Sequence, residues 1–190
     1  MEVSKPDLAS SLPKQWVWFA MRGVLTILFA LFVCFLSPLF DAWRAAGFFA
    51  IFALMQGIVY ITLAWHLQKS GLRWSPYLSF GLIGISFSIV IFSWPEIGMV
   101  ELSYIIAIWA ILAGISDVVV DLLLTRVRDQ GWLLLIGGVI SFLFGFLLFT
   151  RPAHNYLSLF YPLGLLTLCV GVISSIFAGK LHKEEEMRIK

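Results

Sequence analysis

Charged residues are scarce in this chain of 190 residues, since Asp, Glu, Lys and Arg together make up 13% of it. A soluble domain typically contains about 25% charged residues, so the chain has too little charge to cover a solvated surface. Hydrophobic residues make up 61% of the sequence, well above the roughly 45–50% of soluble domains. The net charge of +2 gives no reason to expect nucleic acid as a partner. The composition therefore indicates an integral membrane protein whose main partner is the lipid bilayer.

Cysteine and the residue patterns of common active sites are equally rare. Cys34 and Cys169 each lie within an apolar run, where a free cysteine behaves as a small hydrophobic residue. The sequence contains no dinucleotide-binding glycine motif, no P-loop, no HExxH and no GxSxG. We therefore expect no metal site, no cofactor and no enzymatic activity.

Six apolar runs follow one another along the chain. A helix needs about 20 residues to cross about 30 Å of hydrocarbon, and a backbone in lipid must satisfy its own hydrogen bonds. We therefore expect an all-α membrane protein of six transmembrane helices. The apolar runs cover residues 16–36, 42–65, 74–94, 97–124, 132–150 and 156–179. The membrane domain would then cover residues 16–181, preceded by a cytoplasmic segment, 1–15, and followed by a charged tail, 182–190.

The chain repeats itself with a period of 57 residues. A shift by this number aligns a proline after the first helix of each unit, a glycine in the middle of the second helix, and a basic residue behind it. The prolines are Pro38, Pro95 and Pro152, the glycines are Gly57, Gly114 and Gly171, and the basic residues are Lys69, Arg126 and Lys183. Three two-helix hairpins are therefore expected at 16–66, 74–124 and 132–179. Because each unit has two helices, all three would insert in the same direction, around a pseudo-threefold axis along the membrane normal.

Lysine and arginine are concentrated on one side of the predicted membrane domain. The N-terminal segment, the second and fourth loops and the tail carry eleven of them, whereas the opposite loops carry only Arg44 and Arg151. Connections rich in Lys and Arg remain in the cytoplasm. Both termini are therefore expected on the cytoplasmic side.

Small residues form a stripe along the second helix of each unit. Their spacing of i, i+3 and i+7 keeps them on one helical face, and membrane helices associate where small residues allow a close approach. We therefore expect the stripe to be a helix–helix contact, with the lining of a narrow pore as the alternative. The stripe contains Ala50, Ala53 and Gly57 in the first unit, Ala107, Ala110 and Gly114 in the second, and Gly164, Thr167 and Gly171 in the third.

The first helices of the units show a similar stripe in the second and third units only. The aligned positions are Gly81, Gly84 and Ser88, then Gly138, Ser141 and Gly145, but Val24, Ile27 and Leu31 in the first unit. We therefore expect the first hairpin to pack less closely than the others, or partly against another surface.

Two aspartates and an arginine lie inside the predicted membrane helices, where ionisable groups are costly and usually functional. Asp117 and Asp121 continue the small stripe of the fourth helix, one turn apart. Arg22 and Asp117 lie at matching depths, roughly 12 and 13 Å from the same side. Because the arginine fork pairs well with a carboxylate, we expect a buried Arg22–Asp117 ion pair, with Asp121 nearer the headgroups. The pair would fix which helices meet, and the alternative is a protonation switch made by the two carboxylates.

The repeat resembles the bacterial HdeD-type acid-resistance membrane proteins over about residues 16–181. Each unit has a Phe-x-x-Pro exit from its first helix and a Gly-Ile or Gly-Val pair in its second. The matching residues are Phe35, Pro38, Gly57 and Ile58, then Phe92, Pro95, Gly114 and Ile115, and finally Phe149, Pro152, Gly171 and Val172. The resemblance implies a multi-pass protein of the bacterial inner membrane that is linked to acid stress and has no known catalytic residues. Asp117 and Asp121 are not part of this motif.

Three functions are compatible with these features. The first is a non-enzymatic, stress-related membrane protein that acts by binding or by maintaining the membrane under acid. The second is a small transporter or channel for protons or solutes that uses Arg22, Asp117 and Asp121. The third is an accessory subunit whose first hairpin packs against a larger membrane complex, and a second copy of the chain is the alternative partner.

Overall fold

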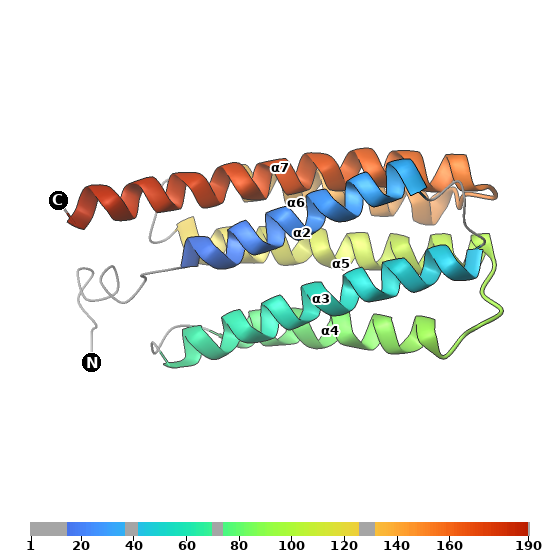
Figure 1. The fold of residues 1–190 in the computed structure, drawn as a ribbon, viewed down its shortest axis with the longest axis horizontal. Helices are drawn as coiled ribbons and strands as arrows, with labels where there is room; N and C mark the ends of the chain where they lie inside the picture. Colours follow the sequence, from blue (N-terminus) through green and yellow to red (C-terminus); the bar gives the residue numbers. More distant parts are fainter. Residues whose placement is uncertain (1–14, 37–41, 70–73, 126–131, 190) are drawn as a thin grey trace.

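The computed structural model describes residues 15–36, 42–69, 74–125 and 132–189 of the chain. Within these ranges the backbone forms six helices that run up and down in one bundle (Figure 1). They are α2 (Gln15–Leu36), α3 (Ala42–Lys69), α4 (Ser75–Phe92), α5 (Met99–Thr125), α6 (Trp132–Thr150) and α7 (Tyr156–Ile189). The all-helical class predicted from the sequence is thus confirmed.

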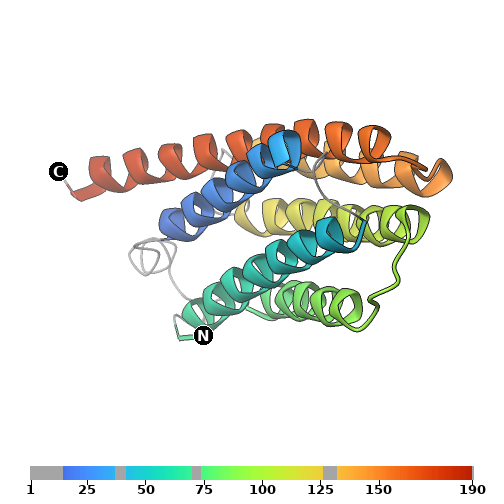
Figure 2. The same cartoon turned by 45° about the vertical axis from the view of Figure 1, so that its right-hand side comes forward.

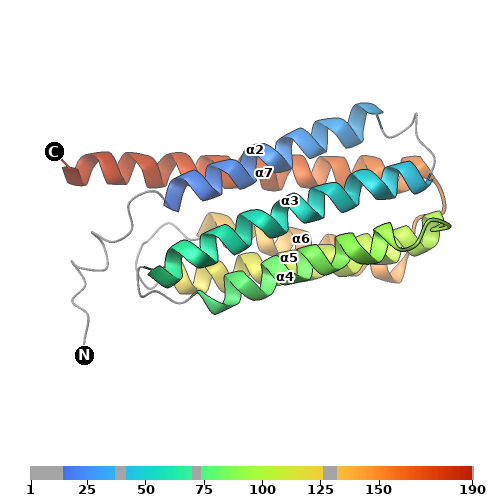
Figure 3. The same ribbon diagram turned by 60° about the horizontal axis from the view of Figure 1, so that its bottom comes forward.

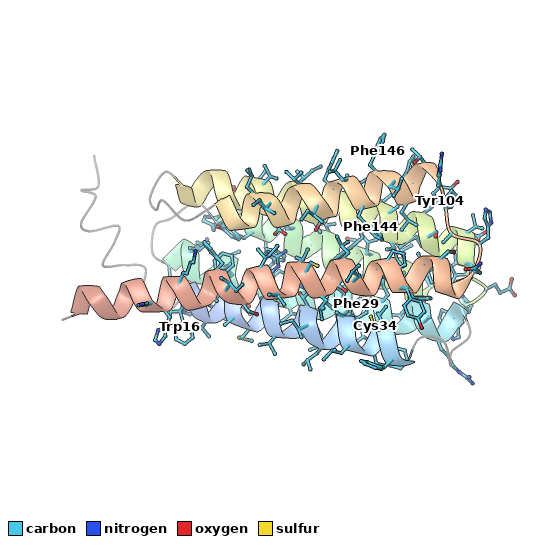
Figure 4. All side chains as sticks on the ribbon, turned by 90° about the horizontal axis from the view of Figure 1, so that it is seen from above. Trp16, Phe29, Cys34, Tyr104, Phe144 and Phe146 are labelled. Carbon is cyan, nitrogen blue, oxygen red and sulfur yellow. The ribbon has the colours of Figure 1, made fainter. Side chains whose placement is uncertain are left out.

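Five of the six described helices, namely α2, α3, α4, α5 and α7, are long and apolar enough to cross a membrane. In α6 the described side chains form a shorter apolar helix, Leu135–Thr150. Large hydrophobic side chains also cover the outside of the bundle, as Figure 4 shows for Phe146, which projects from α6 away from the other helices and is 56% exposed. These features indicate a multi-pass membrane protein, and a sixth crossing by α6 stays a prediction.

Helices α2 and α7 place the two ends of the described chain at one end of the bundle. There α2 begins and α7 ends (Figure 1). We call this end the basal end and the opposite one the distal end. Helix α7 continues without a break to Ile189, and Figure 2 shows its last part projecting beyond the other helices. The charged segment that was predicted as a tail is therefore largely a continuation of α7.

Prolines follow the distal ends of α4 and α6. Helix α4 ends at Phe92, three residues before Pro95, and α6 ends at Thr150, two residues before Pro152. Proline lacks an N–H group and disfavours a helical conformation in the residue before it, which explains why both helices end there. Pro38 lies outside the described residues.

The helices pack most closely in three pairs, which are α2 with α7, α3 with α4, and α5 with α6 (Figures 1 and 3). Each pair joins the second helix of one predicted unit to the first helix of the next, and α7 joins the last unit to the first. The closely packed pairs therefore cross the boundaries of the predicted hairpins. The pseudo-threefold arrangement of three hairpins stays a prediction.

Glycines let the backbones approach one another within these pairs. A Cβ atom added to Gly57 of α3 would lie 2.8 Å from the carbonyl oxygen of Gly81 in α4. One added to Gly114 of α5 would lie 2.6 Å from the carbonyl oxygen of Gly138 in α6. No side chain fits at such distances, so these contacts require glycine.

Helix α2 makes the corresponding contact with α7 through Gly23. A Cβ added to Gly171 of α7 would lie 3.2 Å from the carbonyl oxygen of Gly23 and 3.0 Å from the backbone nitrogen of Ile27. In the α3–α4 pair the same two roles belong to Gly81 and Ile85. Gly23 and Gly81 are 58 positions apart, so α2 is displaced by one residue from the period of 57.

This displacement corrects the expectation that the first hairpin packs less closely. Gly23, Thr26 and Ala30 of α2 are buried, whereas Val24 and Leu31 are exposed. The first helix has its own stripe of small residues, one position before the columns that contain Val24, Ile27 and Leu31. The prediction was wrong because it assumed units of equal length. The accessory-subunit hypothesis loses its main support, since α2 packs against α7.

Candidate functional site

The guanidinium of Arg22 in α2 lies against the carboxylate of Asp117 in α5. Nη2 of Arg22 donates a hydrogen bond of 2.8 Å to Oδ2 of Asp117, and Nη1 forms an ion-pair contact with Oδ1. Such a two-pronged pairing is the strongest and most directional form of a charged hydrogen bond. The two residues are only 7% and 2% exposed. The structure thus brings together the two charged residues that the sequence placed at one depth.

Helix α3 adds Tyr60 to this pair. The ring of Tyr60 lies 5.4 Å from Cζ of Arg22, within the range of a cation–π contact. Its hydroxyl group donates a long hydrogen bond of 3.5 Å to Oδ1 of Asp117 and lies 3.4 Å from Oγ of Ser116. Three helices, α2, α3 and α5, therefore meet at one charged centre.

Two uncharged residues continue the cluster toward the distal end. Nε2 of Gln56 in α3 donates a hydrogen bond of 2.9 Å to Oγ1 of Thr26, which itself donates one of 2.8 Å to the carbonyl oxygen of Arg22. Both side chains are 4% exposed. We call the whole cluster the polar layer, and it consists of Arg22, Thr26, Gln56, Tyr60, Ser116 and Asp117.

The sequence interpretation missed Gln56 and Thr26. Gln56 precedes the aligned glycine of its unit, where the other units have Ala113 and Val170. An amide at a position that is otherwise apolar was the available signal, since uncharged polar side chains inside membrane helices form hydrogen bonds between helices. Thr26 lies four residues after Arg22 and therefore on the same face of α2.

Other predicted residues lie apart from the pair or outside the described side chains. Asp121 belongs to the backbone of α5, but its side chain lies outside the described part, as does all of Arg126. Ala53 and Ala110 are buried, consistent with their place in the predicted contact stripe. Glu101 is exposed in the first turn of α5, where a carboxylate is favoured by the helix dipole.

An aromatic layer closes the distal side of the polar layer. It consists of Phe29, Phe49, Phe52 and Trp109, and Figure 4 shows Phe29 on the distal half of α2. The rings of Phe29 and Phe52 stack with their centres 4.0 Å apart, and Trp109 meets Phe49 edge to face at 5.5 Å. Large rings in these contacts fill space densely, so they separate the polar layer from the distal end.

A second apolar layer covers the basal side. Its buried members include Phe19, Leu63, Tyr77 and Phe177, and the rings of Phe19 and Phe177 meet edge to face at 5.1 Å. Near the basal end of α2, Trp16 stacks on His182 of α7 (Figure 4). The polar layer is thus enclosed between two apolar layers.

This arrangement can hold helices in register and can offer hydrogen bonds to a small neutral guest, because the two charges neutralise each other. In the described part of the chain, no three His, Cys, Asp or Glu side chains lie close enough to hold a metal ion. The polar layer is therefore the candidate site.

Comparison with known proteins gives one family. The chain matches the family described as a short repeat of unknown function (DUF308) twice, over residues 79–150 and 136–188. The two matches begin 57 residues apart, which is the period found in the sequence, and together they cover more than half of the chain. No curated protein and no solved structure matches it.

Proposed function

Because the chain belongs to the DUF308 short-repeat family, we propose that it is a non-enzymatic, HdeD-type protein of the bacterial inner membrane that contributes to acid tolerance. The family match supports the repeat that carries the resemblance to HdeD-type proteins. The equivalent glycine contacts in the three helix pairs support a pseudo-threefold arrangement of the units. In this arrangement the protein acts through its fold in the membrane rather than through a chemical reaction.

The observation that carries the proposal is the position of the ionisable side chains. On the distal side of the polar layer, all described acidic and basic residues are exposed near the end of the bundle. They are Arg44, Glu96, Glu101, Arg151 and His154. Exposed charges contribute little to stability, so acid that reaches the distal end titrates groups of small energetic weight. The aromatic layer separates the buried Arg22–Asp117 pair from that end.

This proposal requires the distal end to face the outside and both termini to lie in the cytoplasm. Lys69, Lys180 and Lys183 are at the basal end, in agreement with the preference of basic residues for the cytoplasm. A reporter that is active only outside the cytoplasm, fused after Lys190, is expected to be inactive. An active reporter would reverse the orientation and with it the argument from acid.

Survival of cells in acid tests the function itself. A bacterial strain that lacks the protein is expected to lose viability in strongly acidic medium and to recover it when the wild-type chain is supplied. Asp117→Asn should fail to restore survival, because it leaves Arg22 charged and unpaired within the membrane. Glu101→Gln, which removes an exposed carboxylate from the same helix, should restore it. Equal survival with and without the wild-type chain would refute a role in acid tolerance.

A second candidate function, passage of protons or small solutes, is favoured by the polar layer, since buried charges in membrane proteins often mark transport paths. It predicts that purified protein in liposomes dissipates a pH gradient faster than protein-free liposomes. If the gradient decays at the same rate in both, the transport hypothesis fails and the acid-tolerance proposal stands.

A further inference from the structure

Two buried polar atoms of the polar layer have no hydrogen-bond partner among the described residues. They are Nε of Arg22 and Oε1 of Gln56, in side chains that are 7% and 4% exposed. The first atom carries a hydrogen and can only donate, whereas the second can only accept. Buried polar groups without partners are rare in native proteins, and each one calls for a partner such as ordered water.

Two small cavities adjoin these atoms, and both are lined by Arg22 and Gln56. The first cavity also contacts Tyr60 and Ser116, and its volume is about 30 Å³. The second cavity, of the same volume, also contacts Asp117 and three hydroxyl side chains. These three side chains are Thr26, Ser141 and Thr167.

We propose that each cavity is a binding site for water, and that the bound water completes the hydrogen bonds of Arg22 Nε and Gln56 Oε1. A water molecule needs roughly 10–15 Å³ and two to four polar partners, and both cavities meet these conditions. Truly empty cavities are lined by apolar side chains, unlike these two.

The charge of the site favours water over an ion. Arg22 and Asp117 neutralise each other, and no other charged side chain lines either cavity. A bound ion would therefore lack a counter-charge in a medium of low dielectric constant, which is costly. A larger neutral solute would exceed the volume. Water can accept from Nε of Arg22 and donate to Oε1 of Gln56 at the same time.

This site goes beyond the proposed function, because it does not depend on a role in acid tolerance. Hydrated cavities would join the separate hydrogen bonds of α2, α3 and α5 into one network. They would also extend that network to Ser141 of α6 and Thr167 of α7, which otherwise lie beside the charged pair without a bond to it in the described structure.

Water-edited solid-state NMR of the full chain in lipid bilayers tests the proposal. With 15N-labelled arginine, the Nε–H signal of Arg22 is identified by its loss in Arg22→Lys. Its intensity is expected to build up from water at least threefold faster than that of the backbone amide of Ile106, which is fully buried in the apolar core. The exposed Arg44 and Arg151 provide the fast reference. A build-up as slow as that of Ile106 would overturn the proposal.

Gln56→Met tests the role of the glutamine without a large change in volume. The build-up at Arg22 Nε is expected to slow at least twofold in this variant, because the acceptor that orients the water is lost. The matched control is Gln68→Met, which changes an exposed glutamine on the same helix and should leave the build-up unchanged. An unchanged rate in Gln56→Met would contradict the assignment of Gln56 as the acceptor.

Discussion

Tyr60 of α3 and Asp117 of α5 occupy equivalent positions, 57 residues apart, and their side chains meet at a distance of 3.5 Å. Equivalent positions of units related by rotation meet where they face the rotation axis, so this contact is what a pseudo-symmetric bundle would produce. The third equivalent residue, Ser174 of α7, is also buried. Three chemically different residues thus occupy one repeated position, and Arg22 pairs with the acidic one.

The glycine contacts predict a large difference between two substitutions of the same kind. Gly114→Ala is expected to lower the free energy of unfolding by about 1–3 kcal/mol, because the added methyl group meets the backbone of α6 and forces overpacking. Gly47→Ala is the control, since nothing lies within 4 Å of a Cβ atom there. Reversible unfolding in mixed detergent micelles measures both. Equal effects would contradict the close approach of α5 and α6.

The displacement of α2 by one residue makes a second prediction. Gly23→Ala should destabilise the protein by about 1–3 kcal/mol through overpacking against α7, because its Cβ would lie 2.9 Å from the backbone nitrogen of Ser175. The neighbouring change Val24→Ala should cost little, since Val24 is 54% exposed. The same unfolding assay decides between the two registers. A larger effect of Val24→Ala would restore the undisplaced one.

The aromatic layer should act as a seal. Phe52→Ala removes a ring that stacks on Phe29 and borders the second cavity, and it should let water reach the polar layer from the distal side. Liposomes with this variant are expected to lose a pH gradient faster than those with the wild-type chain. Phe146→Ala, which removes an outward-facing ring, is the control and should not leak. A tight Phe52→Ala variant would show that the seal lies elsewhere.

Much of the fold could be predicted because membrane helices are limited by length and by backbone hydrogen bonding. The mid-helix glycines were visible as a repeated column, and matching depths pointed to Arg22 and Asp117. The pairing of helices was harder to predict, since short connections on both sides allow a helix to pack against either neighbour. The contact of α2 with α7 joins the two ends of the chain, and no local pattern indicates it.

The register of α2 and the uncharged part of the polar layer escaped prediction for different reasons. A search with a constant shift cannot detect a helix displaced by one residue, so Gly23 fell outside its column. Thr26 and Gln56 carry no charge, and their importance follows only from what surrounds them in three dimensions. Each side chain alone is unremarkable in sequence, and only their mutual hydrogen bond places them beside Arg22.

The Arg22–Asp117 pair is the central claim, and a double-mutant cycle on it is the most direct test. Arg22→Met and Asp117→Asn should each lower the free energy of unfolding by about 3–5 kcal/mol, because each leaves its partner buried without compensation. The double variant should lose much less than the sum, giving a coupling energy of at least about 2 kcal/mol. Single effects that simply add would show that the two residues do not depend on each other, and would contradict the account.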